Sequence, residues 1–157
     1  MTEKQREEAA IVIRETAITF GIGEASAAEI DQINILEASI LAMHRAIEAL
    51  RHPPEYLLVD GNRFRHSSIP FRTVVKGDAL CLSIGAASIL AKTHRDALMR
   101  AIGKEFPAYG FARHKGYATR EHLDAILRHG WCPEHRRSFI VKQFQEHQGE
   151  LFDGMEP

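Results

Sequence analysis

The stretch that decides the fold runs from residue 56 to residue 92 and reads YLLVDGNRFRHSSIPFRTVVKGDALCLSIGAASILAK. Two short apolar runs within it, 56–59 and 73–75, are bounded by glycine and proline, a pattern typical of buried strands. The first run is followed by Asp60 and the second by Asp78, which precedes a long helix rich in small residues. Because open α/β sheets place ligands at the carboxyl ends of their strands, we expect both carboxylates at one site.

Two interpretations fit these carboxylates. Two carboxylates that lie close together repel each other unless a proton or a cation lies between them. Hard oxygen ligands select Mg²⁺ or Mn²⁺, and such ions serve phosphoryl chemistry. The alternative is structural, because Asp-Gly after a strand is a common turn and Gly-Asp before a helix is a common cap. The spacing of the two residues leaves both interpretations open.

Length and composition indicate one globular domain. The chain has 157 residues, 45% of them hydrophobic and 26% charged, which suits a single core. It has no run of 18 apolar residues, and its charged start predicts a helix rather than a signal peptide, so we expect no membrane span. Cys81 and Cys132 form no CxxC pair, and the nine histidines follow no HExxH spacing. These patterns predict reduced thiols in the cytoplasm and no zinc site.

The order of patterns predicts alternating helices and strands. Residues 18–23 are β-prone and predict a strand. Apolar positions recur at helical spacing over residues 35–50, which predicts an amphipathic helix with His44 and Arg45 facing solvent. One helix is expected from Asp78 to about Lys104, and a short one at Pro133. Three caps mark further helix starts: Thr2, Ser26 and Thr119.

The middle of the chain is basic. Residues 52–103 carry 7 Lys and Arg against 4 Asp and Glu, and residues 104–142 carry 8 against 4. This charge is compatible with a polyanionic partner. In this region Tyr117 is flanked by four potentially cationic residues, and basic groups bind phosphates while an aromatic ring stacks on a sugar or base. An ordinary exposed loop with a half-buried tyrosine fits equally well. The four residues are Arg113, His114, Lys115 and Arg120.

Five motifs follow one another along the chain: LLVDGN (57–62), VVKGD (74–78), SIGAASILAK (83–92), YGFARHKGYATREH (109–122) and CPEHRRSF (132–139). In this order they resemble ribonuclease HII. The resemblance covers about residues 2–140 and implies an α/β domain over residues 1–140, while the composition of residues 141–157 predicts a polar acidic tail. The implied fold is a ribonuclease H-like mixed sheet flanked by helices.

The resemblance also implies a reaction. Members of this family hydrolyse the RNA strand of RNA–DNA hybrids and cut at single ribonucleotides in DNA. Cleavage falls on the 5′ side of the ribonucleotide, leaves 3′-hydroxyl and 5′-phosphate ends, and uses two-metal catalysis with Mg²⁺ or Mn²⁺. The expected partners are therefore an RNA–DNA hybrid or a DNA duplex containing ribonucleotides, with no membrane and no small-molecule cofactor besides the metal.

Site residues follow from the same motifs. The family uses four carboxylates as catalytic metal ligands, of which Asp60 matches the third and Asp78 the fourth. Tyr117 matches a tyrosine that stacks beside the sugar at the RNA–DNA junction. Phosphate contacts are expected from three lysines in matching motifs: Lys76, Lys92 and Lys115.

The start of the chain departs from the family pattern. Family members begin with a strand carrying adjacent Asp and Glu, followed by a Gly-Arg-Gly that reads the 2′-hydroxyl. Neither motif occurs in this sequence, and Met1 falls where an internal residue of the family would lie. We therefore expect a sheet incomplete at the N-terminus, with unpaired edges, and a chain that is marginally folded or completed by another chain.

Three functions remain open at this stage. The first is ribonuclease HII activity, which the missing Asp-Glu pair makes doubtful for this chain. The second is a non-catalytic remnant that binds nucleic acid through the basic middle. The third is an unrelated α/β domain for a small phosphorylated ligand. That function would need a glycine-rich phosphate loop, and the sequence has none.

Overall fold

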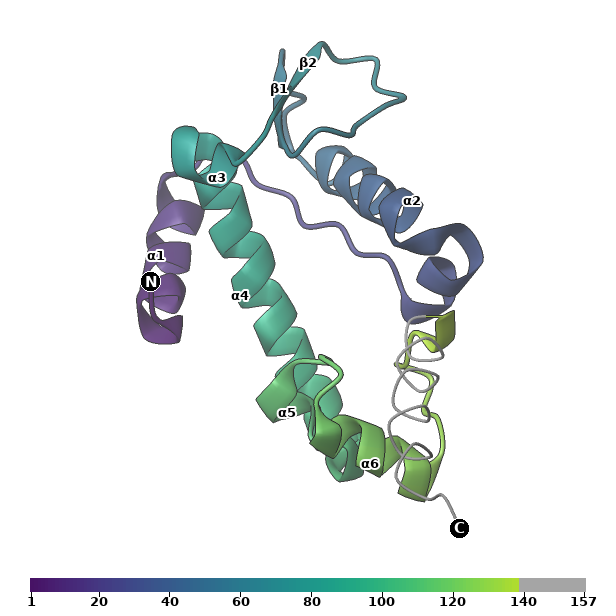
Figure 1. The fold of residues 1–157 in the computed structure, drawn as a ribbon. Helices are drawn as coiled ribbons and strands as arrows, with labels where there is room; N and C mark the ends of the chain where they lie inside the picture. The colour runs from purple at the N-terminus through teal and green to yellow at the C-terminus, as the bar shows by residue number, and fades with distance from the viewer. Residues whose placement is uncertain (139–157) are drawn as a thin grey trace. The chain divides into compact units, whose positions relative to one another are not determined.

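The computed structural model describes residues 1–138, which belong to two compact units (Figure 1). Unit 1 comprises residues 1–25 and 36–95, and unit 2 comprises residues 26–35 and the described residues from 96 onward. The parallel strands lie in unit 1, and a cluster of buried hydrophobic residues lies in unit 2. The acidic tail predicted at 141–157 lies outside the described residues.

The first helix begins as its cap predicts. In α1 (Glu3–Thr16) the Thr2 hydroxyl accepts from the Gln5 backbone at 3.3 Å, and Gln5 Oε1 accepts from the Thr2 backbone at 2.8 Å. This reciprocal pair is a capping box, which satisfies two backbone donors that the helix itself leaves unpaired. The prediction at Thr2 is therefore confirmed.

The second predicted cap opens a kinked helix. The Ser26 hydroxyl accepts from the Glu29 backbone at 3.2 Å, and the Glu29 carboxylate accepts from the Ser26 backbone at 2.8 Å. The helix that follows, α2 (Ala27–Glu48), is interrupted at Asn34, where φ is 69°. Asn34 has non-helical backbone, with ψ at 166°, so a helical segment lies on each side of it, as the sequence predicts.

Residues 18–23 form no strand, so that prediction is wrong. Gly21 and Gly23 instead lie directly against α2. A Cβ atom added at Gly21 would be 2.2 Å from the Ala46 carbonyl oxygen, and one at Gly23 would be 2.1 Å from that of Ala42. The glycines allow this segment to pack along the helix at a distance that no side chain permits.

The prediction that two α2 residues face solvent is also wrong. His44 is half-buried; its ring stacks on Phe64 at 5.1 Å and its Nε2 lies 2.9 Å from the Arg65 carbonyl oxygen. Arg45 donates to the Glu24 carbonyl at 2.7 Å. Segments distant in sequence therefore cover the face of the helix that its apolar pattern leaves polar.

Strands β1 (Leu57–Asp60) and β2 (Phe71–Val74) pair in parallel, with Leu57 opposite Phe71 and Asp60 opposite Val74. Within the described residues these two strands form one parallel sheet. The expectation that the first strand is buried is wrong, because exposure alternates along β1 and Leu58 is 43% exposed.

The long helix expected after β2 is two helices. A single turn, α3 (Gly77–Leu80), is followed by α4 (Leu82–Glu105), with extended backbone at Cys81 between them (φ −125°, ψ 122°). Within residues 1–138, no helix is both long and apolar enough to cross a lipid bilayer.

Unit 2 is built on the end of α4. Its short elements are η1 (Pro107–Tyr109), α5 (Phe111–His114) and α6 (Arg120–His129), the last capped by Thr119 as predicted and ended at Gly130. The expected helix at Pro133 is a turn instead. Buried hydrophobic side chains from these elements form one cluster: Met99, Ile102, Tyr109, Phe111, Leu123, Ala125, Ile126 and Cys132.

Candidate functional site

Asp60 lies at the carboxyl end of β1 and is exposed. Its Oδ1 accepts hydrogen bonds from the backbone of Gly61 at 2.9 Å and of Gly77 at 2.8 Å. The second bond crosses from β1 to the first residue of α3. It therefore fixes the Asp60 carboxylate beside the residue that directly precedes Asp78.

Asp78 is exposed in the first turn of α3, and its placement depends on the glycine before it. A Cβ atom at Gly77 would be 2.6 Å from Ile84 Cδ1 and 3.3 Å from Asp60 Oδ1. Gly77 itself is buried. The absence of a side chain there allows α3 to approach β1, so the structure places Asp60 and Asp78 in the same part of unit 1.

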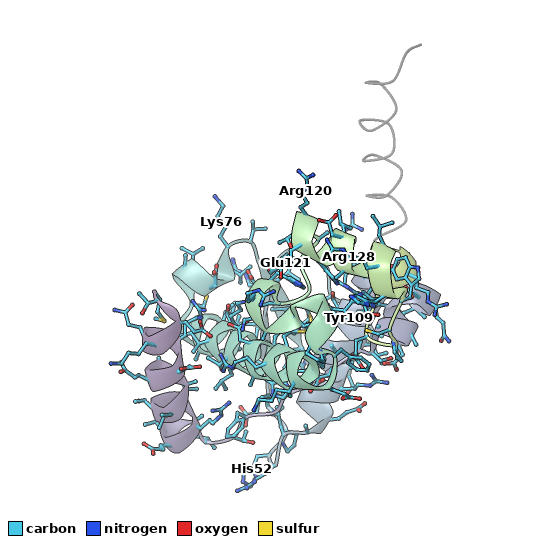
Figure 2. All side chains as sticks on the ribbon, turned by 90° about the horizontal axis from the view of Figure 1, so that it is seen from below. His52, Lys76, Tyr109, Arg120, Glu121 and Arg128 are labelled. Atoms are coloured by element: carbon cyan, nitrogen blue, oxygen red, sulfur yellow. The ribbon has the colours of Figure 1, made fainter. Side chains whose placement is uncertain are left out.

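The lysines of unit 1 differ in their surroundings. Lys76 precedes α3 in a left-handed conformation, with φ at 56° and ψ at 38°, which is uncommon for a residue with a side chain. Figure 2 shows its side chain extending away from the ribbon, and the residue is exposed. Lys92 lies on α4 and is half-buried. Lys76 is thus exposed two residues before Asp78, and its contact with phosphate stays a prediction.

The two carboxylates are the kind of ligand that Mg²⁺ or Mn²⁺ prefers, but they are too few to hold a pair of ions. Both ions prefer oxygen ligands, and Mg²⁺ is often held by one or two carboxylates together with water. Among residues 1–138, no three His, Cys, Asp or Glu side chains come together in a way that could hold a metal. Asp60 Oδ1 already accepts two backbone hydrogen bonds. Asp60 and Asp78 therefore fit one hydrated ion, and they do not supply the ligands that a pair of ions needs.

A shallow apolar groove adjoins Asp78. It has a volume of about 410 Å³ and is open to solvent. Leu80 and Leu82 beside it are 72% and 93% exposed. Its lining comes from α1, α3, α4 and the break between the last two: Ile13, Ala79, Leu80, Cys81, Leu82, Gly85, Ala86 and Ile89.

Tyr117 and Lys115 lie together in unit 2, between α5 and α6. The Tyr117 side chain is 69% exposed, so its ring is accessible to a ligand. Lys115 has left-handed backbone, with φ at 54°, and its Nζ donates to the Ala112 carbonyl at 2.7 Å. These two predicted residues both lie in unit 2, while Asp60, Asp78, Lys76 and Lys92 belong to unit 1.

The expectation of four cationic groups around Tyr117 requires correction. Arg113 forms an ion pair with Glu121. His114 is buried, at 9% exposure, and its Nε2 lies 2.6 Å from the Tyr109 carbonyl oxygen. Arg120 is exposed, and Figure 2 shows it pointing outward from the start of α6. The sequence pattern therefore overstates the positive charge that this loop presents.

Sequence reasoning missed a group of buried histidines beside this loop. His114, His122 and His135 are 9%, 2% and 4% exposed. Burial lowers the pKa of His122 to about 4 and also lowers the pKa of His135. Burial likewise raises the pKa of the Cys132 thiol, which therefore stays protonated at neutral pH. The spacing of the histidines matches no metal motif, so the sequence carried no signal for the group.

Comparison with known proteins identifies the family. The family model described as Ribonuclease HII matches residues 1–145. The chain belongs to the ribonuclease HII family. Its relatives include the ribonuclease HII of Pelodictyon phaeoclathratiforme, 54% identical over 93% of this chain and 71% of that protein. The ribonuclease HII of Chromohalobacter salexigens is 57% identical over 92% of this chain and 73% of that protein.

A solved structure has the same fold. The ribonuclease H2 of Pyrococcus horikoshii OT3 matches with a TM-score of 0.70 and 21% sequence identity, over 88% of this chain and 73% of that one. The mixed α/β, ribonuclease H-like fold expected from the motifs is thereby confirmed. The family assigns the chain to the ribonuclease H-type endoribonucleases, which are divalent-metal-dependent hydrolases acting on nucleic acid. The roles of the six predicted site residues remain predictions.

Proposed function

We propose that this ribonuclease HII chain hydrolyses the RNA strand of RNA–DNA hybrids and cuts DNA on the 5′ side of single ribonucleotides. The products would carry 3′-hydroxyl and 5′-phosphate ends. Family membership supports the reaction class. The observation that carries the proposal is the hydrogen bond from the Gly77 backbone to the Asp60 carboxylate. This bond holds the exposed Asp60 carboxylate beside Gly77, and Gly77 directly precedes Asp78.

The carboxylates would bind Mg²⁺ or Mn²⁺. A divalent ion supplies charge stabilisation at the reacting phosphate and activates water as the nucleophile. Asp60 and Asp78 contribute negative charge and hard oxygen donors, and the Gly61 and Gly77 backbone bonds keep Asp60 oriented. Catalysis by two ions, as in the motif-based prediction, requires further ligands beyond these two residues.

The remaining predicted residues would hold the substrate. The accessible ring of Tyr117 can stack on a sugar or base, and Lys115 beside it can reach a phosphate. Lys76 would contact phosphate next to the carboxylates, and Lys92 is proposed for the same role on α4. Cys81 and Cys132 are free thiols, which suits the reducing cytoplasm that we propose as the compartment.

Cleavage of a DNA duplex with one ribonucleotide tests the proposal. The purified chain is assayed with Mn²⁺ and with Mg²⁺, beside Asp60→Asn, Asp78→Asn and the control Asp124→Asn, which makes the same chemical change on α6. We expect a cut 5′ of the ribonucleotide that falls by roughly a hundredfold or more in the first two variants, the scale of losing one transition-state contact. Equal cleavage by all four proteins would exclude the proposed site.

The number of donors favours a second candidate, a non-catalytic binder of nucleic acid. At the proposed metal site the described residues provide two carboxylates, Asp60 and Asp78, and no cluster of three metal-ligating side chains. The exposed Tyr117 and the nearby Lys115 could still bind nucleic acid. Such a chain would bind a hybrid duplex with an affinity that falls as salt rises, and would release no product. Fluorescence anisotropy with a labelled hybrid, at several salt concentrations and without cleavage in the parallel assay, would identify this case.

A further inference from the structure

The three buried histidines of unit 2 form a stack. The rings of His114 and His122 are 4.4 Å apart with an angle of 19° between their planes, and those of His122 and His135 are 5.1 Å apart at 27°. Such burial requires that each ring nitrogen find a hydrogen-bond partner, because an unsatisfied buried polar atom is costly. The partners in turn determine which nitrogen carries the proton.

The Tyr117 carbonyl fixes the tautomer of His122. His122 Nδ1 lies 3.0 Å from the Tyr117 carbonyl oxygen. A carbonyl oxygen accepts hydrogen bonds and cannot donate them, so Nδ1 must carry the proton. In a neutral imidazole the other nitrogen is then an acceptor. His122 Nε2 lies 3.1 Å from His135 Nε2, so His135 Nε2 must donate to it.

The remaining contacts agree with this assignment. Since Nε2 of His135 carries its proton, Nδ1 of that ring must accept, and the Cys132 backbone N–H donates to it at 2.9 Å. The Cys132 carbonyl oxygen also lies 3.2 Å from this Nδ1, but it accepts from the His135 backbone N–H at 3.2 Å instead. His114 is satisfied in the same way, because the Gly116 backbone donates to its Nδ1 at 3.2 Å and its Nε2 donates to the Tyr109 carbonyl at 2.6 Å. A directed chain thus runs from Cys132 through His135 and His122 to Tyr117.

The chain ends on the backbone of the residue whose ring is exposed. The Tyr117 carbonyl accepts from His122 and from the Thr119 backbone at 2.9 Å, and the Tyr117 N–H donates to the His114 carbonyl at 2.9 Å. Both backbone groups of Tyr117 are therefore fixed by the buried stack and its neighbours. The side chain is left 69% exposed.

We propose that His122 is a positioning residue for Tyr117: its Nδ1–H, fixed by the bond from His135, holds the Tyr117 carbonyl and so presents the ring to nucleic acid. The proposal rests on the proposed role of Tyr117 in substrate binding. The surroundings favour a neutral ring, because burial and the positive charge of Arg136 disfavour its protonation, and its titratable neighbours are His114 and His135.

The tautomers can be measured without any substrate. Two-dimensional ¹⁵N–¹H NMR of the histidine side chains distinguishes a protonated Nδ1 from a protonated Nε2. At neutral pH we expect the Nδ1–H form for His122 and the Nε2–H form for His114 and His135. An Nε2–H form of His122 would overturn the proposal, because that ring could not donate to the Tyr117 carbonyl.

Two substitutions separate positioning from simple support of the fold. His122→Asn keeps a donor near the place of Nδ1, whereas His122→Gln places its amide near Nε2 and leaves the Tyr117 carbonyl without its partner. We expect His122→Gln to weaken binding of an RNA–DNA hybrid by about tenfold, the lower range for loss of one stacked ring. His122→Asn should stay within about twofold of the wild type. Equal losses in the two variants would refute positioning.

A double-mutant cycle with Tyr117→Ala links the effect to the ring. If His122 acts through Tyr117, His122→Gln adds little to the binding loss in the Tyr117→Ala background. Additive losses would overturn the proposal. If Tyr117→Ala alone leaves affinity unchanged, the proposed role of Tyr117 in binding fails instead. Hydrogen exchange at the Gly116 and Tyr117 amides then decides positioning independently: faster exchange in His122→Gln than in His122→Asn supports it, and equal exchange refutes it.

Discussion

Acid should destabilise unit 2 through His122. Burial lowers the pKa of this histidine from 6.5 to about 4, with further lowering by the positive charges of His114, His135 and Arg136. Below pH 6.5 the unfolded chain therefore binds a proton that the folded chain does not. Stability from this residue is fully present above 6.5, and is lost as the pH falls toward about 4.

The size of the loss follows from the pKa difference. Each pKa unit corresponds to about 1.4 kcal/mol, so the interval between 6.5 and about 4 amounts to roughly 3 kcal/mol of unfolding free energy. The lowered pKa of His135 acts in the same direction. Because typical domains are stable by about 5–15 kcal/mol, a loss of this size is large enough to measure by urea titration.

The single tryptophan provides the assay. Trp131 packs edge-on against His135, with ring centroids 5.6 Å apart, so its fluorescence during urea unfolding reports on unit 2. Titrations over a series of pH values between 6.5 and 4 are compared for the wild type and for His122→Asn. The variant lacks the His122 titration, so we expect its unfolding free energy to fall less steeply over this interval. The total fall in the variant should be smaller than that in the wild type by up to roughly 3 kcal/mol.

The comparison uses slopes, because any substitution at a buried site also changes the absolute stability. His52→Asn is the matched control, since His52 is exposed in unit 1 and Figure 2 shows it at the periphery. It should leave the slope reported by Trp131 unchanged. If wild type and His122→Asn lose stability in parallel between pH 6.5 and 4, the burial of a neutral His122 is refuted.

Three further predictions concern single contacts. Gly77→Ala should destabilise unit 1 by about 1–3 kcal/mol through overpacking, because the new Cβ meets Ile84 Cδ1 at 2.6 Å. Thermal unfolding measures this loss, and it should be smaller for Gly85→Ala, whose new Cβ has the Asp78 carbonyl oxygen at 3.1 Å as its nearest contact. Asp31→Ala should lower the unfolding free energy by about 1–3 kcal/mol, since the Asp31 carboxylate accepts from the Arg137 backbone at 2.9 Å and from the Ser138 hydroxyl at 2.6 Å. Asp31→Asn keeps one acceptor oxygen, so an equal loss of stability in that variant would argue against loss of the acceptor as the cause. Thr2→Ala should cost about 1 kcal/mol by removing the capping box, measurable as lower helicity by circular dichroism, and Thr2→Ser should retain it.

The features predicted correctly from the sequence are those set by local chemistry. Thr2, Ser26 and Thr119 mark helix starts because each side chain binds a backbone amide within three residues. The two strands, β1 and β2, follow from two short apolar runs bounded by glycine and proline, whereas their parallel pairing is known from the structure alone. The positions of Asp60 and Asp78 after these segments follow from the same pattern. The family of the chain follows from the motifs that contain these two residues.

The features predicted wrongly depend on contacts between distant segments. Residues 18–23 have strand propensity, but Gly21 and Gly23 allow closer packing on α2 than any side chain would. His44 appears polar on a helical projection, yet Phe64 and the Arg65 carbonyl cover it. The histidine stack is likewise invisible in sequence, because its members are 8 and 13 residues apart and resemble neither a metal motif nor a core pattern.

The two candidate binding regions are built on the same principle. In unit 1 the Asp60 carboxylate binds the backbone of Gly77, and Asp78, the next residue, stays exposed. In unit 2 His122 binds the backbone carbonyl of Tyr117, and the ring of Tyr117 stays exposed. In each case a side chain fixes the backbone at or next to a residue that we propose contacts the ligand. Asp60 is itself a proposed metal ligand, whereas the His122 ring is not proposed to touch the nucleic acid. Because ordering a backbone residue costs about 1–2 kcal/mol, fixing it before binding leaves less of that cost to be met by the nucleic acid.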